Sequence, residues 1–368
     1  MKDILEWLVT AEDPRQQAKV KHLMKDILAI VFFAELANAS EWIEMYLFAL
    51  THEDPLRKYL ELPNGIPSHD TIQRVFAMVS PEYLQDFRAR WNDAMSKGMG
   101  NTIRKILALD GKTQRGNGSA EHKANHIVSA VDEQGFCVGE TLVDDKSNEI
   151  TAIPELLKSL NIKGHIVTTD AMGCQQDIVR LIRHKKAHYM LGLKGNQGTL
   201  HEDVALYFSD PHLRTSCAYH KVVDKARSAV EIREYWQTTD IAWLDSKKAW
   251  ADLTSIVMTQ NTIIKDGVAT AQTRYFISSL PLHVEEAARA IRGHWMVESY
   301  HWHLDVTFRE DANHTLDRAA AYNLNIVKKM AINTLRLLDV GIARISMKNK
   351  RYILSMNFGH YLDTLMAL

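Results

Sequence analysis

Two aspartates end apolar runs in this 368-residue sequence. Asp110 closes the run 106–109 and is followed at once by Gly111, and Asp170 closes the run 165–169 in a similar way. An apolar run that stops at a carboxylate predicts a buried strand that delivers the acid to a sheet edge. Two such carboxylates could hold a hard divalent cation between them, because Mg²⁺ prefers carboxylate oxygens and keeps some of its waters.

A third carboxylate is expected on a long amphipathic helix at about Val284–Asp305. Glu298 follows His294 by four residues and precedes Asp305 by seven, and these spacings place the side chains on one helix face together with His301. Imidazoles and carboxylates make an unusual core face and suit a metal-bearing cleft. The sequence therefore favours Glu298 as the third ligand.

Glu149 is the alternative third ligand. It opens the helix expected at 149–160, with Asn148 as its N-cap. An acidic residue in a first helical turn also has an ordinary explanation, because the helix dipole stabilises it.

Three clustered carboxylates could hold two divalent ions and support an in-line phosphoryl displacement on a nucleic acid. Because like charges repel, such a cluster should bind metal readily and be poorly ordered without it. The sequence has no HExxH motif, so a zinc protease is not supported, and the segment 111–116 is not a phosphate-binding P-loop.

The elements around the two aspartates predict a mixed sheet. Strands are expected at 106–109, 126–131 and 136–143, then a helix, the strand ending at Asp170, a second helix and the strand 189–193. A right-handed crossover can lay the fourth strand parallel to the first. Their C-terminal ends, with Asp110 and Asp170, would then be neighbours at the usual site edge of an α/β sheet.

The rest of the chain is assigned to three regions. Residues 1–100 are expected to form a helical domain, either a DNA-binding module or a plain helical domain, ending in a linker at 97–101. In it, Asp70 and Gln73 predict a capping box for a helix at 71–78. The catalytic domain is expected at 101–340, with a β-rich insertion at about 200–280 that the long spacing from Asp170 to Glu298 requires. Residues 341–368 are expected as a basic tail.

Composition adds exclusions. The 44 Lys and Arg nearly balance the 45 Asp and Glu, so net charge gives no sign of a nucleic-acid partner. Cys137, Cys174 and Cys217 are far apart, which argues against zinc fingers and disulfides and fits a reducing cytoplasm. We expect no secretory signal and no membrane span, because charged residues interrupt the apolar stretch 23–39.

Several long segments carry a family resemblance. They are ALDGKTQRG, DDKSNEITAIPELL, IVTTDAMGCQ, LGLKGNQGTLHEDV, YFISSLP and IRGHWMVESYHWHLDVTFRED, with DPRQQAKVKHLMKDIL and NGIPSHDTIQRVF nearer the N-terminus. Together they make nearly the whole chain resemble the H-repeat-associated transposases, the ISAs group of bacterial insertion sequences. The resemblance implies a ribonuclease H-like core whose DDE triad maps onto Asp110, Asp170 and Glu298, holding two Mg²⁺ ions or Mn²⁺ in their place.

The resemblance also implies partners. These are double-stranded DNA of the element ends and of the target, a homodimer in the DNA complex, and action at the nucleoid of a bacterial cytoplasm. Two other functions stay open: a metal-dependent nuclease without strand transfer, and a domesticated DNA-binding protein without catalysis. Glu149 also stays open, because ribonuclease H enzymes carry a metal-binding glutamate at that helix start.

Candidate DNA contacts are the cations and polar groups near the triad. Many related transposases have an Arg four residues before the glutamate and a Lys seven after it, where this chain has His294 and Asp305. The motif that more often reads HWGIEN in these transposases is HWMVES in this chain, at residues 294–299. Phosphate contacts must therefore come from elsewhere, and the DNA-binding candidates are Lys112, Arg115, Lys194, Asn196, Arg292 and His294.

Overall fold

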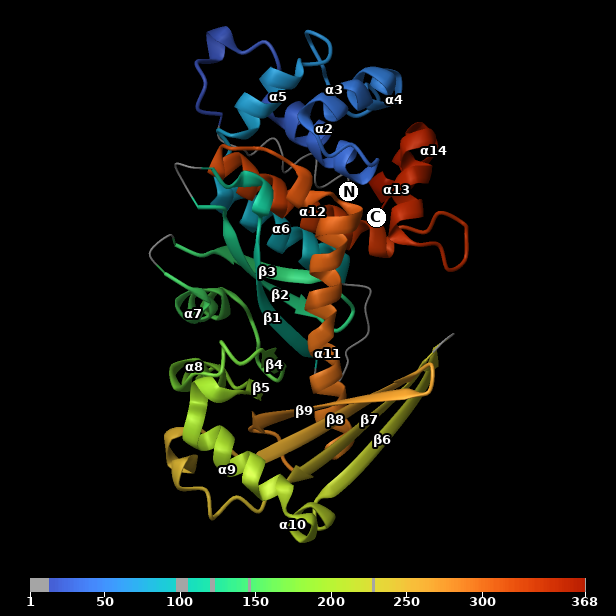
Figure 1. Cartoon of the computed structure of the whole chain (residues 1–368). Helices are drawn as coiled ribbons and strands as arrows, with labels where there is room; N and C mark the ends of the chain where they lie inside the picture. Colours follow the sequence, from blue (N-terminus) through green and yellow to red (C-terminus); the bar gives the residue numbers. More distant parts are fainter. Residues whose placement is uncertain (1–12, 97–104, 120–122, 145–146, 227–228, 368) are drawn as a thin grey trace.

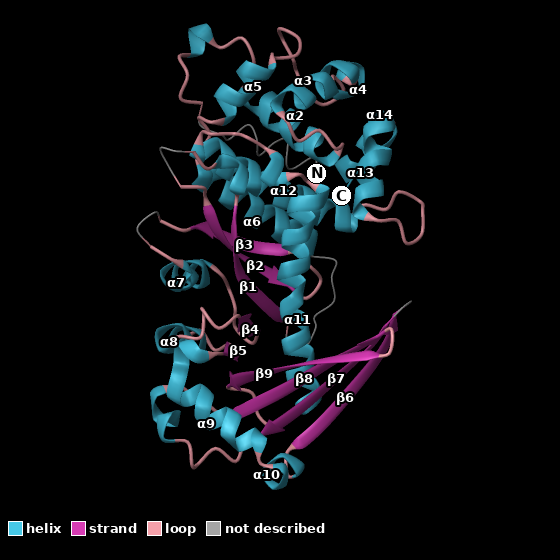
Figure 2. Cartoon of the chain, in the orientation of Figure 1, coloured by secondary structure: helices cyan, strands magenta, loops and turns pink. Residues whose placement is uncertain are grey.

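The chain folds into helices at one end and a long mixed sheet at the other (Figures 1 and 2). The computed structural model describes residues 13–96, 105–119, 123–144, 147–226 and 229–367. The expected linker at 97–101 lies outside these residues. The N-terminal helices are α2 (Met24–Leu36), α3 (Trp42–Thr51), α4 (Glu53–Leu56), α5 (His69–Phe76) and α6 (Pro81–Ser96). The expected mixed α/β class with a helical N-terminal region is confirmed.

The start of α5 differs from the expected capping box. The helix begins at His69, and the hydroxyl of Ser68 accepts a hydrogen bond from the backbone N–H of Thr71. Ser68 is therefore the N-cap, and Asp70 lies in the first turn, where the helix dipole favours a carboxylate. The prediction of Asp70 as the cap was wrong because Ser68 supplies an equally good cap earlier in the chain.

The strands of the described residues form one nine-stranded sheet with the order β3-β2-β1-β4-β5-β9-β8-β7-β6. As predicted, β1 and β4 are parallel neighbours, while β1 pairs antiparallel with β2. The strands are β1 (Ile106–Thr113), β2 (His126–Asp132), β3 (Cys137–Leu142), β4 (Ile166–Thr169), β5 (His188–Leu193), β6 (Ala218–Ala226), β7 (Ala229–Thr238), β8 (Ser255–Lys265) and β9 (Val268–Ser278).

The expected β-rich insertion begins with helices and then extends the core sheet. Two helices, α9 (Gly198–Ser209) and α10 (Pro211–Thr215), precede β6. β9 pairs antiparallel with β5, so β6 to β9 form an arm continuous with the core strands. The first seven residues of β9 are exposed and the last two are buried, so only its end next to the core is part of the hydrophobic interior.

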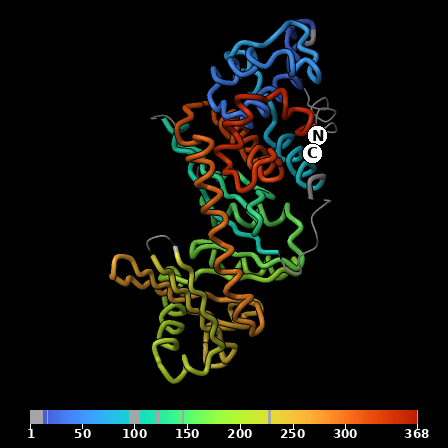
Figure 3. The backbone as a smooth tube through the Cα atoms, turned by 90° about the vertical axis from the view of Figure 1, so that its right-hand side faces the viewer, coloured from blue at the N-terminus to red at the C-terminus, as the bar shows by residue number. Residues whose placement is uncertain are grey.

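Helices cover both faces of the sheet. One face is covered by α7 (Glu149–Ser159), α8 (Gln176–His184) and α9, which bury Leu107 and Leu109 of β1. The long α11 (Val284–Trp302) crosses the other face from the arm to the helical end of the molecule (Figures 1 and 3). It packs closely on β1, since a Cβ at Gly293 would lie 2.9 Å from the Ile106 Cδ1.

The C-terminal residues are packed helices and not a basic tail. After α11, the chain forms a π-helical turn at His303–Thr307 and then α12 (Arg318–Leu337), α13 (Met347–Met356) and α14 (Phe358–Ala367). These helices share one apolar core with α2 and α3. Among the described residues, no helix is both long enough and apolar enough to cross a membrane.

Arg351 shows why the tail prediction was wrong. Its side chain is fully buried, and its guanidinium donates to the backbone carbonyls of Glu35 and Thr307. It also lies 3.4 Å from the Glu35 carboxylate. Burial lowers the pKa of Arg351 to about 10, against the opposing effect of Glu35. The basic residues suggested a solvent-exposed segment, whereas Arg351 joins α13 to the end of α2 and to the turn after α11.

We predict that Arg351→Met destabilises the protein strongly. The change removes a buried cation from the Glu35 carboxylate and the guanidinium donors from the Glu35 and Thr307 carbonyls, and breaking a buried ion pair typically costs about 3–5 kcal/mol of unfolding free energy. Denaturant unfolding measures the effect, with Lys348→Met on the exposed side of α13 as the matched control. Equal unfolding midpoints for the two variants would contradict the structural role of Arg351.

Candidate active site

Asp110 and Asp170 follow paired residues of β1 and β4, which are neighbouring interior strands of the sheet. Leu109 is paired with Thr169 in the parallel register of β1 and β4, and each aspartate is the next residue of the chain. Because side chains alternate along a strand, Asp110 lies on the same face as Ile106, which packs against α11. The structure thus places the two predicted aspartates directly after paired residues of neighbouring parallel strands, Asp110 within β1, which continues to Thr113, and Asp170 just after the end of β4.

The loop that carries Asp170 is held by hydrogen bonds from the LKGNQ motif. The Asp170 Oδ1 accepts a bond from the backbone N–H of Met172 (2.9 Å). The Asn196 side chain donates to the carbonyl oxygen of Ala171 (2.6 Å), and Gln197 donates to that of Cys174 (2.9 Å). Asn196 therefore fixes the aspartate's loop, a role that the sequence did not suggest.

Lys194, the other predicted contact in this motif, is exposed directly after β5. It remains a candidate DNA contact from the rim of the site.

Glu298 belongs to α11, which runs along β1. Gly293 packs on Ile106, and the His301 Nδ1 lies 3.5 Å from the Asp110 Oδ2. Between these contacts the helix rises about 12 Å and the strand about 13 Å, so the two run side by side in the same direction. Glu298 is exposed on the helix between them, one turn before His301.

Two histidines line the same face of α11. The His294 Nδ1 lies 3.0 Å from the Thr168 hydroxyl of β4. Burial lowers the pKa of His294, against the opposing charges of Asp110, Glu298 and Asp170, and Arg274 lowers it further. All three predicted carboxylates therefore act on one imidazole. The Nε2 of His301 is buried and has no hydrogen-bond partner in the described part of the chain.

The chemistry of the donors fits a divalent cation, although the carboxylates are not gathered tightly. Within the described ranges, no group of three or more His, Cys, Asp or Glu side chains is close enough to hold a metal ion. Mutual repulsion keeps carboxylates apart until a cation neutralises them. The carboxylate oxygens of Asp110, Asp170 and Glu298 are hard donors of the kind that Mg²⁺ takes.

Glu149 lies on the other face of the sheet. Its carboxylate is 2.7 Å from the His126 Nε2, and the opposite ring nitrogen is 2.8 Å from the Thr113 hydroxyl. A Cβ at Gly111 would collide with the Glu149 carboxylate and the His126 ring. Since Gly111 and Asp110 are successive strand residues, Glu149 and Asp110 occupy opposite faces.

Lys112 joins β1 to the end of α11. Its Nζ is 2.7 Å from Asp305, 2.9 Å from Glu310 and 3.1 Å from Asp311. Although burial raises the pKa of Glu310, Lys112 and then Lys328 outweigh it and lower that pKa to about 2. Lys112, expected as a DNA contact, is thus held by three carboxylates.

Neighbouring Arg115 differs from Lys112 in its exposure. Its side chain is 83% exposed, against 11% for Lys112.

The role of Glu310 was missed by sequence reasoning, because the ion pair between Lys112 and Glu310 joins residues that are distant in sequence and leaves no local pattern. The acidic pair at 310–311, directly after the motif helix, was the one visible signal.

Comparison with known proteins decides the family. A family model described as a transposase DDE domain matches residues 101–334. The chain belongs to this family. A second model, described as DDE_Tnp_1-associated, matches residues 5–92. Both matches confirm the resemblance drawn from the sequence motifs and the ribonuclease H-like class of the core.

Named relatives agree with the family. The putative transposase YncI of Escherichia coli O157:H7 is 35% identical over 97% of this chain and 93% of its own length. The H repeat-associated putative transposase YhhI of Escherichia coli K12 is 34% identical, with 97% of each chain covered. An inactive transposase, YbfQ, is 40% identical over 20% of this chain. Transposase membership supports an enzymatic role.

We predict that Lys112→Met destabilises this transposase in a pH-dependent way. The buried Glu310 carboxylate loses its main cation, which should cost about 3–5 kcal/mol at neutral pH. In the parent protein, the lowered Glu310 pKa contributes stability above pH 4.5 that is lost as the pH falls towards 2. Without Lys112, burial should raise this pKa, so the variant should gain stability as the pH falls from neutral.

Chemical unfolding at several pH values measures this difference. Arg115→Met is the control, because it removes a cation from the same segment at an exposed position. If Lys112→Met lost stability with falling pH as the parent does, Lys112 would not be the partner that keeps Glu310 ionised.

Proposed function

We propose that this protein is a metal-dependent DNA transposase that cuts at the ends of an insertion sequence and joins the resulting 3′-hydroxyls to target DNA. Asp110, Asp170 and Glu298 are its catalytic metal ligands. The observation that carries the proposal is the parallel pairing of Leu109 with Thr169, the residues that directly precede Asp110 and Asp170. The DDE domain match over 101–334 supports the reaction class.

The chain's own groups organise the site. Asp110 is part of β1, Asp170 begins the loop directly after β4, and Glu298 belongs to α11, which packs on β1. Thr168 orients the His294 ring, and Asn196 fixes the loop after Asp170. When bound, two Mg²⁺ ions, or Mn²⁺ in their place, would supply activation of the attacking oxygen and neutralisation of charge on the leaving oxygen.

The proposal includes the partners of the reaction. The substrates are double-stranded element ends and target DNA, and the two ends are brought together by a homodimer in the DNA complex. The enzyme acts on chromosomal DNA at the nucleoid of a bacterial cytoplasm. Family membership and its named bacterial relatives support this setting.

The faces of the sheet favour Glu298 over Glu149 as the third ligand. We expect Glu298→Gln to fold and to bind DNA but to cut at least a thousandfold more slowly, on the order of the loss seen when a catalytic charge-stabilising group is removed. Glu149→Gln should keep measurable cutting, because Glu149 lies with His126 behind Gly111. The reverse result would move the third ligand to Glu149.

One assay measures cutting and joining. Labelled duplexes that carry the DNA flanking this coding sequence on each side are incubated with protein, Mg²⁺ and a target plasmid. We expect cut ends and joined product with Mg²⁺ or Mn²⁺ and neither with EDTA. Cutting without joining would indicate a nuclease, and binding without cutting would indicate a domesticated protein without catalysis.

A further inference from the structure

The arm presents ordered rows of polar side chains towards α11. On this face, Tyr235, Thr259 and Arg274 are register partners across β7, β8 and β9. The adjoining row holds Arg233, Asn261 and Gln272. With Ile291, Arg292 and Trp295 of α11, these residues line a small hollow. The arm strands run out to one side of the molecule, away from the axis of α11 (Figure 1).

Two arginines at this hollow are exposed and are not neutralised by a neighbouring acid in the described residues. Arg274 and Arg292 are exposed, and neither has a carboxylate partner among the residues that the structure describes. Arg274 donates to the Gln272 side chain (3.1 Å), which leaves most of its N–H groups available. By contrast, Arg233 is neutralised by Asp224 and Glu231.

Trp295 holds Arg292 in a defined position. The Arg292 guanidinium lies over the indole, 4.2 Å from the ring centroid. This cation–π contact fixes the plane of the group without using its hydrogen-bond donors. A pre-positioned planar fork of donors is suited to bidentate contact with phosphate.

The hollow adjoins the candidate active site. Trp295 precedes Glu298 by three residues and therefore lies about one helical turn away on a neighbouring part of the same surface. Arg274 is close enough to His294 to act on its charge, and His294 contacts Thr168 beside Asp170. A polyanion seated at the carboxylates would extend directly over these arginines.

We propose that Asn261, Gln272, Arg274, Arg292 and Trp295, named here the arginine hollow, bind the DNA phosphates next to the phosphate that is cut. Phosphate contacts of this kind fix the register of a DNA backbone without reading its sequence. They also offset the repulsion between DNA and the three carboxylates. The inference rests on the proposed function, because it takes DNA as the substrate of the adjacent site.

The opposite face of the arm provides a matched control. There Arg214 lies 5.8 Å from the ring centroid of Trp236, whose neighbours belong to the core under α7 to α9. This is the same pair of residue types, formed by Arg214 of α10 and Trp236 of β7 on the face of the arm away from α11. Removing the Arg214 charge should leave DNA at the active site unaffected.

Fluorescence anisotropy with a short labelled DNA duplex over a range of salt concentrations tests the proposal. All proteins carry Glu298→Gln to prevent cutting. Arg274→Gln and Arg292→Gln should each weaken binding several-fold, and each should lower the slope of log affinity against log salt by about one. Arg292→Lys should recover part of the affinity, whereas Arg214→Gln should change neither affinity nor slope.

The outcomes separate this inference from the proposed function. If the parent binds DNA and the Arg274→Gln, Arg292→Gln double variant matches it in affinity and slope, the arginine hollow is not a DNA site and the transposase proposal stands. An equal loss in Arg214→Gln would likewise overturn the assignment to this face. A parent protein that bound no DNA would overturn both proposals.

Discussion

The candidate site depends on the contacts that hold α11 against β1. At one end, Gly293 lets the helix approach Ile106 closely. At the other, Lys112 is bound by carboxylates that follow the helix. The strand carries Asp110 and the helix carries Glu298, so their separation is set by these two attachments. A helix attached at one end alone would leave Glu298 free to swing away from the strand ends.

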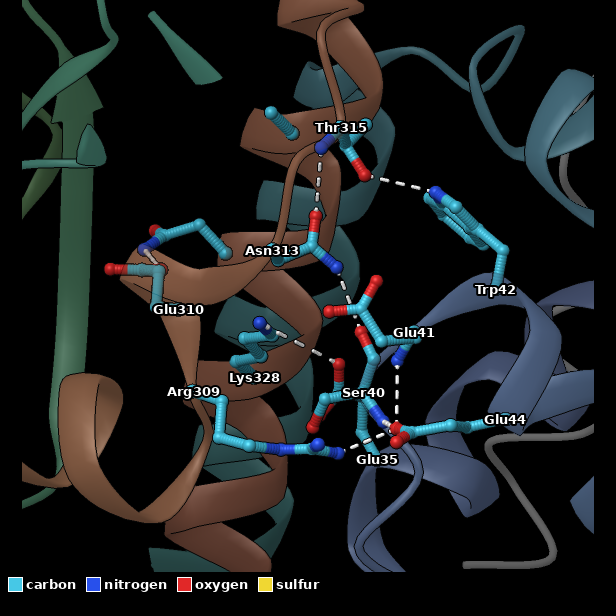
Figure 4. A network of polar contacts seen from close by, with 12 residues as sticks. Glu35, Ser40, Glu41, Trp42, Glu44, Arg309, Glu310, Asn313, Thr315 and Lys328 are labelled. Atoms are coloured by element: carbon cyan, nitrogen blue, oxygen red, sulfur yellow. Dashed lines mark hydrogen bonds and ion pairs between the residues drawn. The ribbon is translucent and has the colours of Figure 1, made fainter. Parts of the chain in front are cut away.

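The segment that follows α11 also contacts the N-terminal helices (Figure 4). After α11, the chain turns back through Asn313, whose side chain donates to the Ser40 carbonyl, and Thr315, which accepts from Trp42. Arg309 pairs with Glu44 in the same region, while Glu310 faces Lys112. One short segment thus contacts both the helical end and β1, which makes the helical end part of what positions Glu298.

Sequence reasoning recovered what local pattern encodes. The apolar runs before Asp110 and Asp170 predicted β1 and β4, and the order of elements predicted their parallel pairing. The expected end of β1 at Asp110 was wrong, because β1 continues to Thr113 in its pairing with β2. Contacts between distant segments had no such signal. The Lys112–Glu310 pair joins residues nearly two hundred positions apart. Arg351 is buried although it follows a run of basic residues, and such a run usually indicates a solvent-exposed segment. The triad and its metals remain predictions from motif and position.

Metal-directed backbone cleavage tests the central claim most directly. Fe²⁺ is substituted for Mg²⁺, and ascorbate with peroxide then generates hydroxyl radicals that cut the polypeptide near the bound metal. Fragment masses are read by mass spectrometry with DNA bound. We predict cuts close to Asp110, Asp170 and Glu298, all suppressed by excess Mg²⁺. Cuts near Asp110, Glu149 and His126, with none on α11, would contradict a site built on the face that α11 crosses.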